Sequence, residues 1–197
     1  MKLLVIPARG GSKRLPRKNI KNFAGRPIIK WSIEAGLKTN YFDEVIVSTD
    51  DEEIKSVSES AGAKVPFLRP KNISDDYTST VDVIRHSIYW YQSKGYNFTS
   101  ITCLYATAPF TTENDLRKAV ELYENSLNKE AFVFSATKFA SSIQRAFFIN
   151  SSGFSEMFAP ENYASRTQDL VKAYYDAGQF YIASPDTWLK KENIFEN

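Results

Sequence analysis

The first eighteen residues constrain the fold more than any other part of the chain. A strand-length apolar run, residues 3–6, passes directly into a loop that holds Gly10 and Gly11. Nine of the 25 Lys and Arg residues lie between Met1 and Ile33, where there is no Asp or Glu. Sixteen remain for the rest of the chain, against 23 Asp and Glu. This gathering of positive charge after the first strand predicts a polyanionic ligand, such as a nucleotide triphosphate, at the carboxyl edge of a sheet.

Short apolar runs alternate with helical patterns up to residue 136. We expect strands at residues 2–6, 44–48, 64–68, 99–105 and 132–136, and helices at residues 27–38, 51–61, 81–93 and 112–127. Pro27 suits the first turn of the first helix, and Asp50 or Asp51 the N-cap of the second. Continuous apolar strands that alternate with helices predict an α/β fold, with helices on both faces of a mostly parallel sheet.

The pattern changes after residue 137. Residues 146–149 and 154–158 flank a polar turn and predict a hairpin, and residues 179–183 return as an apolar strand. We therefore expect a single domain over residues 1–197, in which residues 139–178 form an inserted arm.

Composition excludes several classes of protein. The chain is 43% hydrophobic and 24% charged, as in ordinary globular proteins, and no apolar run reaches the roughly 20 residues of a membrane span. The net charge of +2 is too small to indicate nucleic-acid binding. The single cysteine, Cys103, lies in an apolar strand pattern and is expected to be a core residue of a cytoplasmic protein. The sequence after Met1 does not resemble a signal peptide.

The glycine loop fits neither of two familiar phosphate-binding motifs. The order Gly11-Ser12-Lys13 reverses that of a P-loop, and there is no G-x-G-x-x-G. Glycines still allow backbone N–H groups to approach an anion closely. The loop carries more positive charge than a turn needs: Arg9, Lys13, Arg14, Arg17, Lys18 and Lys21. Arg9 and Lys18 are predicted to contact phosphates, whereas Lys13 and Arg14 could equally be solvated.

Several polar residues at later strand ends have two interpretations each. Asp50 is either a helix cap or a site residue, and Arg69 is either a ligand contact or half of a surface ion pair. Asp76 belongs to a polar segment, residues 74–80, that either caps the next helix or contributes to the site. His86, the only histidine, falls inside a helical pattern and is expected to be structural.

These residues resemble the signature of the cytidylyltransferases that convert eight- and nine-carbon keto acids into CMP-sugars. The resemblance covers nearly the whole chain, and the matching segments are residues 6–13, Pro16, Lys18-Asn19, residues 47–50, Arg69-Pro70 and Asp76. Within this family, residues 105–109, 165–169 and 175–181 are most similar to the members that act on pseudaminic acid.

The resemblance implies a three-layer, Rossmann-like nucleotide-diphosphosugar transferase fold, in which the arm pairs two copies into a homodimer. It implies transfer of CMP from CTP to the anomeric hydroxyl of a nonulosonic acid, with release of pyrophosphate. Pseudaminic acid is the first expectation for the sugar. The alternatives are N-acetylneuraminic, legionaminic or another keto-deoxy acid, or a form that binds CTP without turnover. Neither nucleic acid nor membrane is an expected partner.

The resemblance also assigns residues. Arg9 and Lys18 would be catalytic. The CTP contacts would be Ala8, Arg9, Gly10, Gly11, Ser12, Lys18, Asn19, Arg69, Asp76, Thr80, Tyr105 and Thr107. The sugar contacts would be Tyr105, Arg166, Gln168, Asp176 and Gln179. Mg²⁺ is the expected cofactor, but its ligands stay unassigned because the chain has no Asp-x-Asp near its end, where the family has one. Asp186 is expected to be a turn residue.

Overall fold

A computed structural model describes residues 1–13 and 15–195 of the chain. Arg14, whose role the sequence left open, lies outside the described residues. The chain forms two compact units, which are Met1–Ser135 with Gly178–Asn197, and Ala136–Ala177. The predicted arm, residues 139–178, begins and ends within three residues of the bounds of the second unit. Whether the two units act as one domain stays a prediction.

A five-stranded sheet with the order β4-β1-β5-β9-β6 organises the first unit. Its strands are β1 (Lys2–Pro7), β4 (Glu44–Ser48), β5 (Ser100–Leu104), β6 (Val133–Lys138) and β9 (Tyr174–Ala183), of which β6 and β9 also include residues of the second unit. β1 runs parallel to both β4 and β5, whereas β9 is antiparallel to β5. The predicted strand at residues 64–68 appears as two parallel bridges, Ile46 to Lys64 and Thr49 to Leu68.

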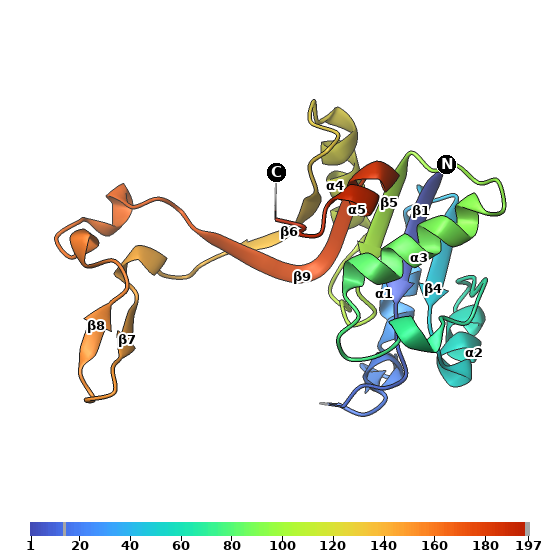
Figure 1. The fold of residues 1–197 in the computed structure, drawn as a ribbon, viewed down its shortest axis with the longest axis horizontal. Helices are drawn as coiled ribbons and strands as arrows, with labels where there is room; N and C mark the ends of the chain where they lie inside the picture. Colours follow the sequence, from blue (N-terminus) through green and yellow to red (C-terminus); the bar gives the residue numbers. More distant parts are fainter. Residues whose placement is uncertain (14, 196–197) are drawn as a thin grey trace. The chain divides into compact units, whose positions relative to one another are not determined.

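Helices cover both faces of this sheet. The α-helices are α1 (Ile29–Lys38), α2 (Glu52–Ser60), α3 (Thr80–Gln92), α4 (Glu113–Asn125) and α5 (Pro185–Lys190). Leu4 and Ile6 of β1 pack with α1, α2 and α4, while Leu3 and Val5 pack with α3 and α5. Side chains alternate between the two faces of a strand, so β1 is buried on both sides. The predicted three-layer α/β fold is confirmed, and Figure 1 shows α3 across one face of the strands.

Capping residues explain where the helices of this unit begin. Asp51 accepts a hydrogen bond from the Ile54 N–H at 2.9 Å and caps α2, so Asp50 is not the cap. Ser79 and Thr112 form capping boxes at α3 and α4. The prediction for Pro27 was wrong, because Pro27 lies in β3 (Arg26–Pro27), which pairs with β2 (Asn22–Phe23).

The end of the chain contains a helix that the sequence did not predict. α5 has six residues, too few for a hydrophobic period to show. The prediction that Asp186 is a turn residue was wrong, since it lies in the first turn of α5. Trp188 of this helix is fully buried, and its Nε1 donates to the Ile101 carbonyl at 3.1 Å. No helix within residues 1–13 and 15–195 is long and apolar enough to cross a membrane.

The second unit contains the predicted hairpin. β7 (Phe147–Ile149) pairs antiparallel with β8 (Ser155–Met157). Asn150 closes the turn, because its Oδ1 accepts from the backbone N–H groups of Ser152 and Phe154, each at 3.0 Å. Short 3₁₀ turns also lie in this unit, at Ile143–Arg145, Pro160–Asn162 and Thr167–Asp169. The described part of the first unit has others at Lys18–Ile20 and Lys71–Ile73.

Candidate functional site

A cleft of about 200 Å³ opens at the carboxyl ends of β1 and β5, beside the start of α3. Its lining comes from three regions that are far apart in the sequence, within residues 7–19, 69–83 and 105–107. The lining residues are Pro7, Arg9, Lys18, Asn19, Arg69, Thr78, Ser79, Thr80, Val83, Tyr105, Ala106 and Thr107. This edge of a parallel sheet is where α/β proteins bind their ligands.

Seven of the residues that we assigned to CTP line this cleft. They are Arg9, Lys18, Asn19, Arg69, Thr80, Tyr105 and Thr107. The other five do not line it: Ala8, Gly10, Gly11, Ser12 and Asp76. Ala8 is fully buried in the core, and its N–H donates to the Ser48 carbonyl at 2.9 Å. The structure therefore gathers the predicted side chains, while their roles toward a ligand remain predictions.

Arg69 is the most unusual polar residue of the cleft. It is only 5% exposed, and its Nε and Nη2 are buried without a hydrogen-bond partner among the described residues. Burial lowers the pKa of its guanidinium from the ordinary value. Buried donors without partners are costly, and a ligand that supplies acceptors here would relieve that cost. Of the two interpretations of Arg69, the cleft contact agrees with this geometry, since no ion pair to it is found within the described chain.

Tyr105 is held in place from two sides. Its hydroxyl lies 2.9 Å from Thr80 Oγ1 at the start of α3. Its carbonyl accepts from Ser32 Oγ of α1 at 2.9 Å, and its N–H donates to the Gln179 carbonyl at 2.8 Å. The phenol is thus a fixed part of the cleft wall.

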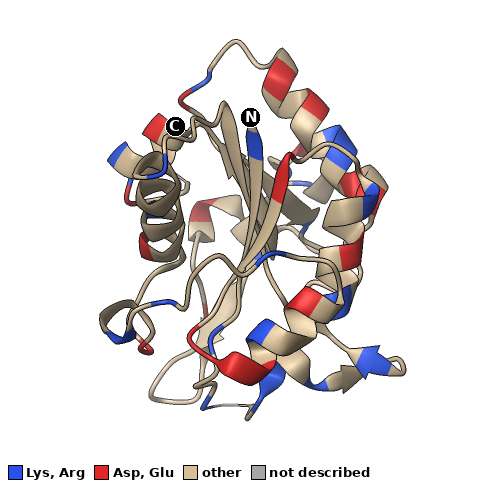
Figure 2. Ribbon diagram, turned by 90° about the vertical axis from the view of Figure 1, so that its right-hand side faces the viewer, with Lys and Arg blue, Asp and Glu red and all other residues tan. Residues whose placement is uncertain are grey.

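Carboxylates from later segments neutralise much of the basic loop. Arg9 Nη2 lies 2.5 Å from Asp76 Oδ1, and Lys13 Nζ lies 2.6 Å from Asp76 Oδ2. Hydrogen bonds from Lys13 and Arg9 hold the pKa of the Asp76 carboxyl below its ordinary value. Asp76 thus makes its contacts with two loop cations rather than with the cleft. Figure 2 shows residues of both signs spread over the helices and loops around the sheet.

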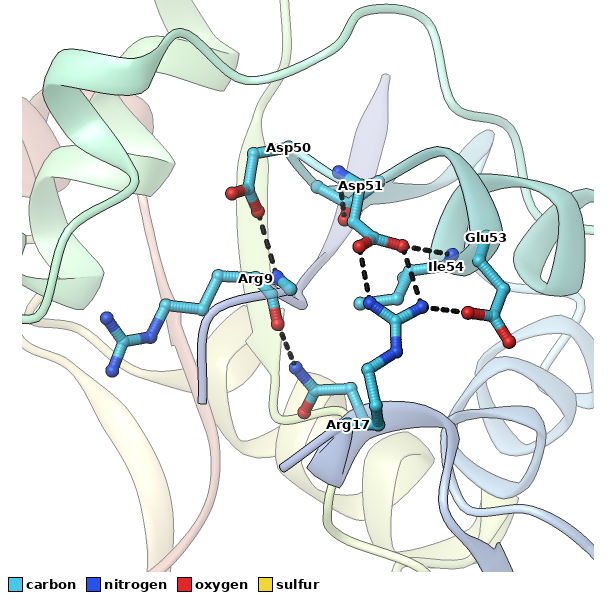
Figure 3. A network of polar contacts seen from close by, with 9 residues as sticks. Arg9, Arg17, Asp50, Asp51, Glu53 and Ile54 are labelled. Carbon is cyan, nitrogen blue, oxygen red and sulfur yellow. Dashed lines mark hydrogen bonds and ion pairs between the residues drawn. The ribbon is translucent and has the colours of Figure 1, made fainter. Parts of the chain in front are cut away.

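A second group of carboxylates follows β4 and contacts the same loop. The Gly10 N–H donates to Asp50 Oδ1 at 2.9 Å, which gives Asp50 a loop-holding contact instead of a cap (Figure 3). Asp51 accepts from Arg17 Nη2 at 3.0 Å, and Arg17 also pairs with Glu53. Arg17 therefore points to α2 and is absent from the cleft lining.

Five cleft residues were not among the assigned contacts: Pro7, Thr78, Ser79, Val83 and Ala106. Thr78 and Ser79 belong to the polar segment 74–80 and precede the assigned Thr80. The Ser79-x-x-Asp82 capping signature could have located them directly before the first turn of α3. Val83 lies three residues after Thr80, on the same side of α3, so helical spacing could have found it.

Apart from Tyr105, the residues assigned to the sugar do not line the cleft. Arg166 Nε pairs with Asp169 at 2.7 Å in the second unit, and both side chains are exposed. Gln168 lines a cavity of about 440 Å³ within that unit, and Asp176 lies on β9. Gln179 is not in the cleft lining, and its Oε1 accepts from Thr111 Oγ1 at 3.2 Å. Their roles toward a sugar stay predictions.

The packing around His86 and Cys103 indicates structural roles for both residues. The His86 ring packs edge-on against Phe67 at 4.7 Å, and burial lowers its pKa, followed by the charge of Arg69. Cys103 is fully buried in β5, and burial raises the pKa of its thiol, so it is not a poised nucleophile. The core prediction for Cys103 is confirmed.

A protein-built metal cage is not found in the described part of the chain. Within residues 1–13 and 15–195, no three His, Cys, Asp or Glu side chains come together in a way that could hold a metal ion. Mg²⁺ at nucleotide sites often takes only one or two carboxylates and binds substrate phosphates otherwise. The described residues therefore form no cage of three protein ligands, and a Mg²⁺ ion at this cleft would have to be held mainly by the substrate phosphates.

Comparisons with known proteins agree with this geometry. Residues 3–186 match the family described as Cytidylyltransferase. The chain is 48% identical to the pseudaminic acid cytidylyltransferase of Campylobacter jejuni, over 98% of this chain and 83% of that protein. It is 31% identical to the N-acylneuraminate cytidylyltransferase of Escherichia coli, over 98% of this chain and 44% of that protein.

Solved structures support the fold alone. A CMP:2-keto-3-deoxy-manno-octonic acid synthetase complexed with CTP superposes with a TM-score of 0.70 at 19% identity, covering 95% of this chain and 76% of that one. The family match extends over most of the chain, and one relative is nearly half identical in sequence. Together they establish the family of this chain. The chain belongs to the cytidylyltransferase family.

Proposed function

We propose that this cytidylyltransferase transfers CMP from CTP to the anomeric hydroxyl of pseudaminic acid and releases pyrophosphate. The observation that carries the proposal is the 48% identity to the Campylobacter jejuni pseudaminic acid enzyme, which extends over 98% of the chain. Such a match covers the cleft segments and the second unit together. The cleft lies at the sheet edge where a nucleotide is expected.

The side chains of the cleft suit a direct displacement. The anomeric hydroxyl would attack the α-phosphorus of CTP and release its proton to water. The new P–O bond would form as the bond between the α-phosphorus and the oxygen bridging to the β-phosphate breaks, and pyrophosphate would leave with the electron pair. No nucleophilic side chain is needed. Arg9 and Lys18 would stabilise the charge that develops on the phosphates, and the fixed walls at Arg69 and Tyr105 would orient the nucleotide.

Arg69 supplies the chemistry for base or phosphate recognition. Its Nε and Nη2 are buried and have no partner in the described part of the chain, so they are donors that an oxygen or ring nitrogen acceptor of CTP would satisfy. We propose that they contact the cytosine, as the family resemblance implies. Tyr105 and Thr107 would then line the junction between nucleotide and sugar, with Arg166, Gln168, Asp176 and Gln179 as the proposed sugar contacts.

Three further features belong to the same proposal. Mg²⁺ is the proposed cofactor, and activity should be lost with a chelator and restored by added Mg²⁺. The protein is proposed to work as a homodimer that forms through the second unit. The cytoplasm is the proposed location, which the single buried thiol supports.

The main rival keeps the reaction and changes the sugar. The chain is 38% identical over 62% of its length to a Legionella pneumophila CMP-N,N'-diacetyllegionaminic acid synthase. The higher identity and wider coverage of the pseudaminic acid enzyme favour pseudaminic acid.

A substrate panel tests both. Pyrophosphate release is measured with CTP and Mg²⁺, with pseudaminic, N-acetylneuraminic and legionaminic acids run in parallel. Release that is fastest with pseudaminic acid is the expected result. A clear preference for another sugar would transfer the assignment to that sugar, and CTP binding without release from any of them would contradict turnover.

A further inference from the structure

The basic loop is attached to the start of α2 at two points, and each point is next in the chain to a cleft-lining cation. Gly10 is one point and follows Arg9. Arg17 is the other and precedes Lys18. Both Arg9 and Lys18 line the cleft, whereas Gly10 and Arg17 do not. Figure 3 shows Arg17 in its contacts with Asp51 and Glu53, with Arg9 and Asp50 nearby.

The Arg17 attachment is a forked ion pair. Arg17 Nη1 lies 2.5 Å from Asp51 Oδ2, Nη2 lies 3.0 Å from Asp51 Oδ1, and Nη2 also pairs with Glu53. A two-point fork of this kind fixes the orientation of both partners, which a single lysine contact does not.

The backbone of Arg17 gives independent support. Its φ of 56° and ψ of 28° lie in the left-handed region, which is unfavourable for a residue with a Cβ. Glycine would adopt this conformation without that cost. Such a conformation persists where the surrounding structure holds it, and the fork to Asp51 and Glu53 is a contact that can do so. Directly after it, Lys18 begins the 3₁₀ turn Lys18–Ile20.

The Gly10 attachment is a hydrogen bond to Asp50, the neighbour of Asp51, and the loop also lies close to Asp51 itself. A Cβ on Gly10 would lie 2.6 Å from Asp51 Oδ2 and 2.9 Å from Asp51 Cβ, so the loop backbone lies against the Asp51 side chain. Asp51 in turn caps α2 through the Ile54 N–H. One rigid helix end therefore supports both sides of the loop.

We propose that Arg17 is a positioning residue for the transfer reaction, which acts by holding Lys18 at the cleft through its fork to Asp51 and Glu53. Arg17 itself touches no ligand, because two carboxylates already neutralise it and it faces α2. This inference rests on the proposed function for its catalytic consequence, but the attachment of the loop does not depend on that function.

The first experiment measures the loop directly. Arg17→Met keeps most of the length of the side chain and removes the fork, and Arg117→Met is the matched control on the exposed side of α4. Hydrogen exchange should become faster in peptides that span residues 10–20 of the Arg17→Met protein, with β1 and β5 unchanged. Arg117→Met should leave the loop as in the wild type. Unchanged loop exchange in Arg17→Met would overturn the proposal, whatever the enzyme's substrate proves to be.

The second experiment asks whether Arg17 acts through Lys18. We expect Arg17→Met to lower kcat by about 10- to 100-fold, since small misplacements of a catalytic group have effects of this size, with a smaller change in the KM for CTP. In Arg17→Met with Lys18→Ala, the loss should be close to that of Lys18→Ala alone. Multiplication of the two separate losses would show an independent role for Arg17 and contradict the proposal.

Further variants separate the effect of the left-handed backbone at Arg17 from that of its side chain. Arg17→Gly removes the fork but relieves the left-handed conformation, and Arg17→Lys keeps the charge but not the two-point geometry. Partial recovery of kcat in Arg17→Lys, with none in Arg17→Gly, is the result expected for a positioning role. Full activity in Arg17→Gly would show that only the backbone conformation matters. A wild-type enzyme that is inactive with every sugar would refute the proposed function, while the exchange result would still decide the attachment.

Discussion

At the scale of single residues, Gly10 and Gly11 look equivalent in the sequence but differ in their surroundings. A Cβ on Gly10 would collide with Asp51, whereas a Cβ on Gly11 would meet nothing within 4 Å. Gly10→Ala should therefore lower the free energy of unfolding by about 1–3 kcal/mol through overpacking. Gly11→Ala should change it by less than about 1 kcal/mol. Urea unfolding of both variants measures the difference, and equal effects would contradict the close approach at Gly10.

Lys18 carries the second residue-scale prediction. If it stabilises the charge on the phosphates, Lys18→Ala should lower turnover by about two to three decades, the size of a lost oxyanion contact. Lys118→Ala, which removes an exposed lysine of α4, is the matched control and should leave turnover unchanged. Near-normal turnover in Lys18→Ala would remove Lys18 from the proposed chemistry.

The sequence predicted which residues gather in the cleft better than it predicted their partners. Arg9, Lys18 and Arg69 could be placed together because strand ends of a parallel sheet meet at one edge. The pairing of Arg9 with Asp76, or of Arg17 with Asp51, could not be predicted. These partners lie 67 and 34 residues apart in the numbering, and any of several carboxylates could have supplied the charge.

At the scale of elements, α1 lies very close to β1 at Gly36. A Cβ on Gly36 would collide with Cδ2 of Leu4, whose side chain is fully buried. Gly36→Ala should gain about 1 kcal/mol of helix propensity but lose more through this collision, for a net loss of stability. The loss should shrink in a Leu4→Val background, where the colliding group is shorter. A stabilising effect of Gly36→Ala in the wild-type background would contradict the close packing.

The start of α2 should show a pH-dependent stability. A hydrogen bond from Arg17, followed by that of the Ile54 N–H, lowers the pKa of Asp51 in the folded protein. Folding therefore favours the ionised carboxyl, and its contribution is present above the unfolded pKa of about 4 and is lost as the pH falls through the folded pKa.

Asp51→Asn isolates this charge, because asparagine caps a helix about as well as aspartate. At pH 7 the variant should be less stable by at most about 1 kcal/mol, since Arg17 is more than one-third exposed. Urea unfolding at pH 7, 5 and 3.5 should show the gap closing at the lowest pH. A gap that is the same at all three values would exclude a contribution from the ionised carboxyl.

Helices and strands could be predicted where the local sequence pattern was strong. β4 was predicted with its observed bounds because its β-branched run ends at a polar turn and a cap. α5 was missed because six residues show no period, and its stability comes from Trp188 packing 4.8 Å from Phe132. Pro27 does not begin α1, because it pairs with Asn22 in a hairpin whose turn contains Gly25 at a positive φ. This tertiary pairing overrides the local preference of proline for the first turn of a helix.

At the scale of the whole molecule, the hairpin of the second unit exposes apolar side chains on both of its faces. Phe147 and Ile149 are 60% and 63% exposed on one face of β7, and Phe148 packs against the exposed Phe158 on the other. A two-stranded hairpin is marginal alone in water, and exposed apolar surface of this kind commonly marks a protein interface. Family resemblance assigns it to a second copy of the chain, so we predict a homodimer by light scattering.

Phe147→Ser with Ile149→Ser should shift the protein toward monomer, whereas Leu122→Ser, an exposed position of α4, should not. A dimer that persists in the double variant would place the contact elsewhere, and a monomeric wild type would refute the proposed assembly.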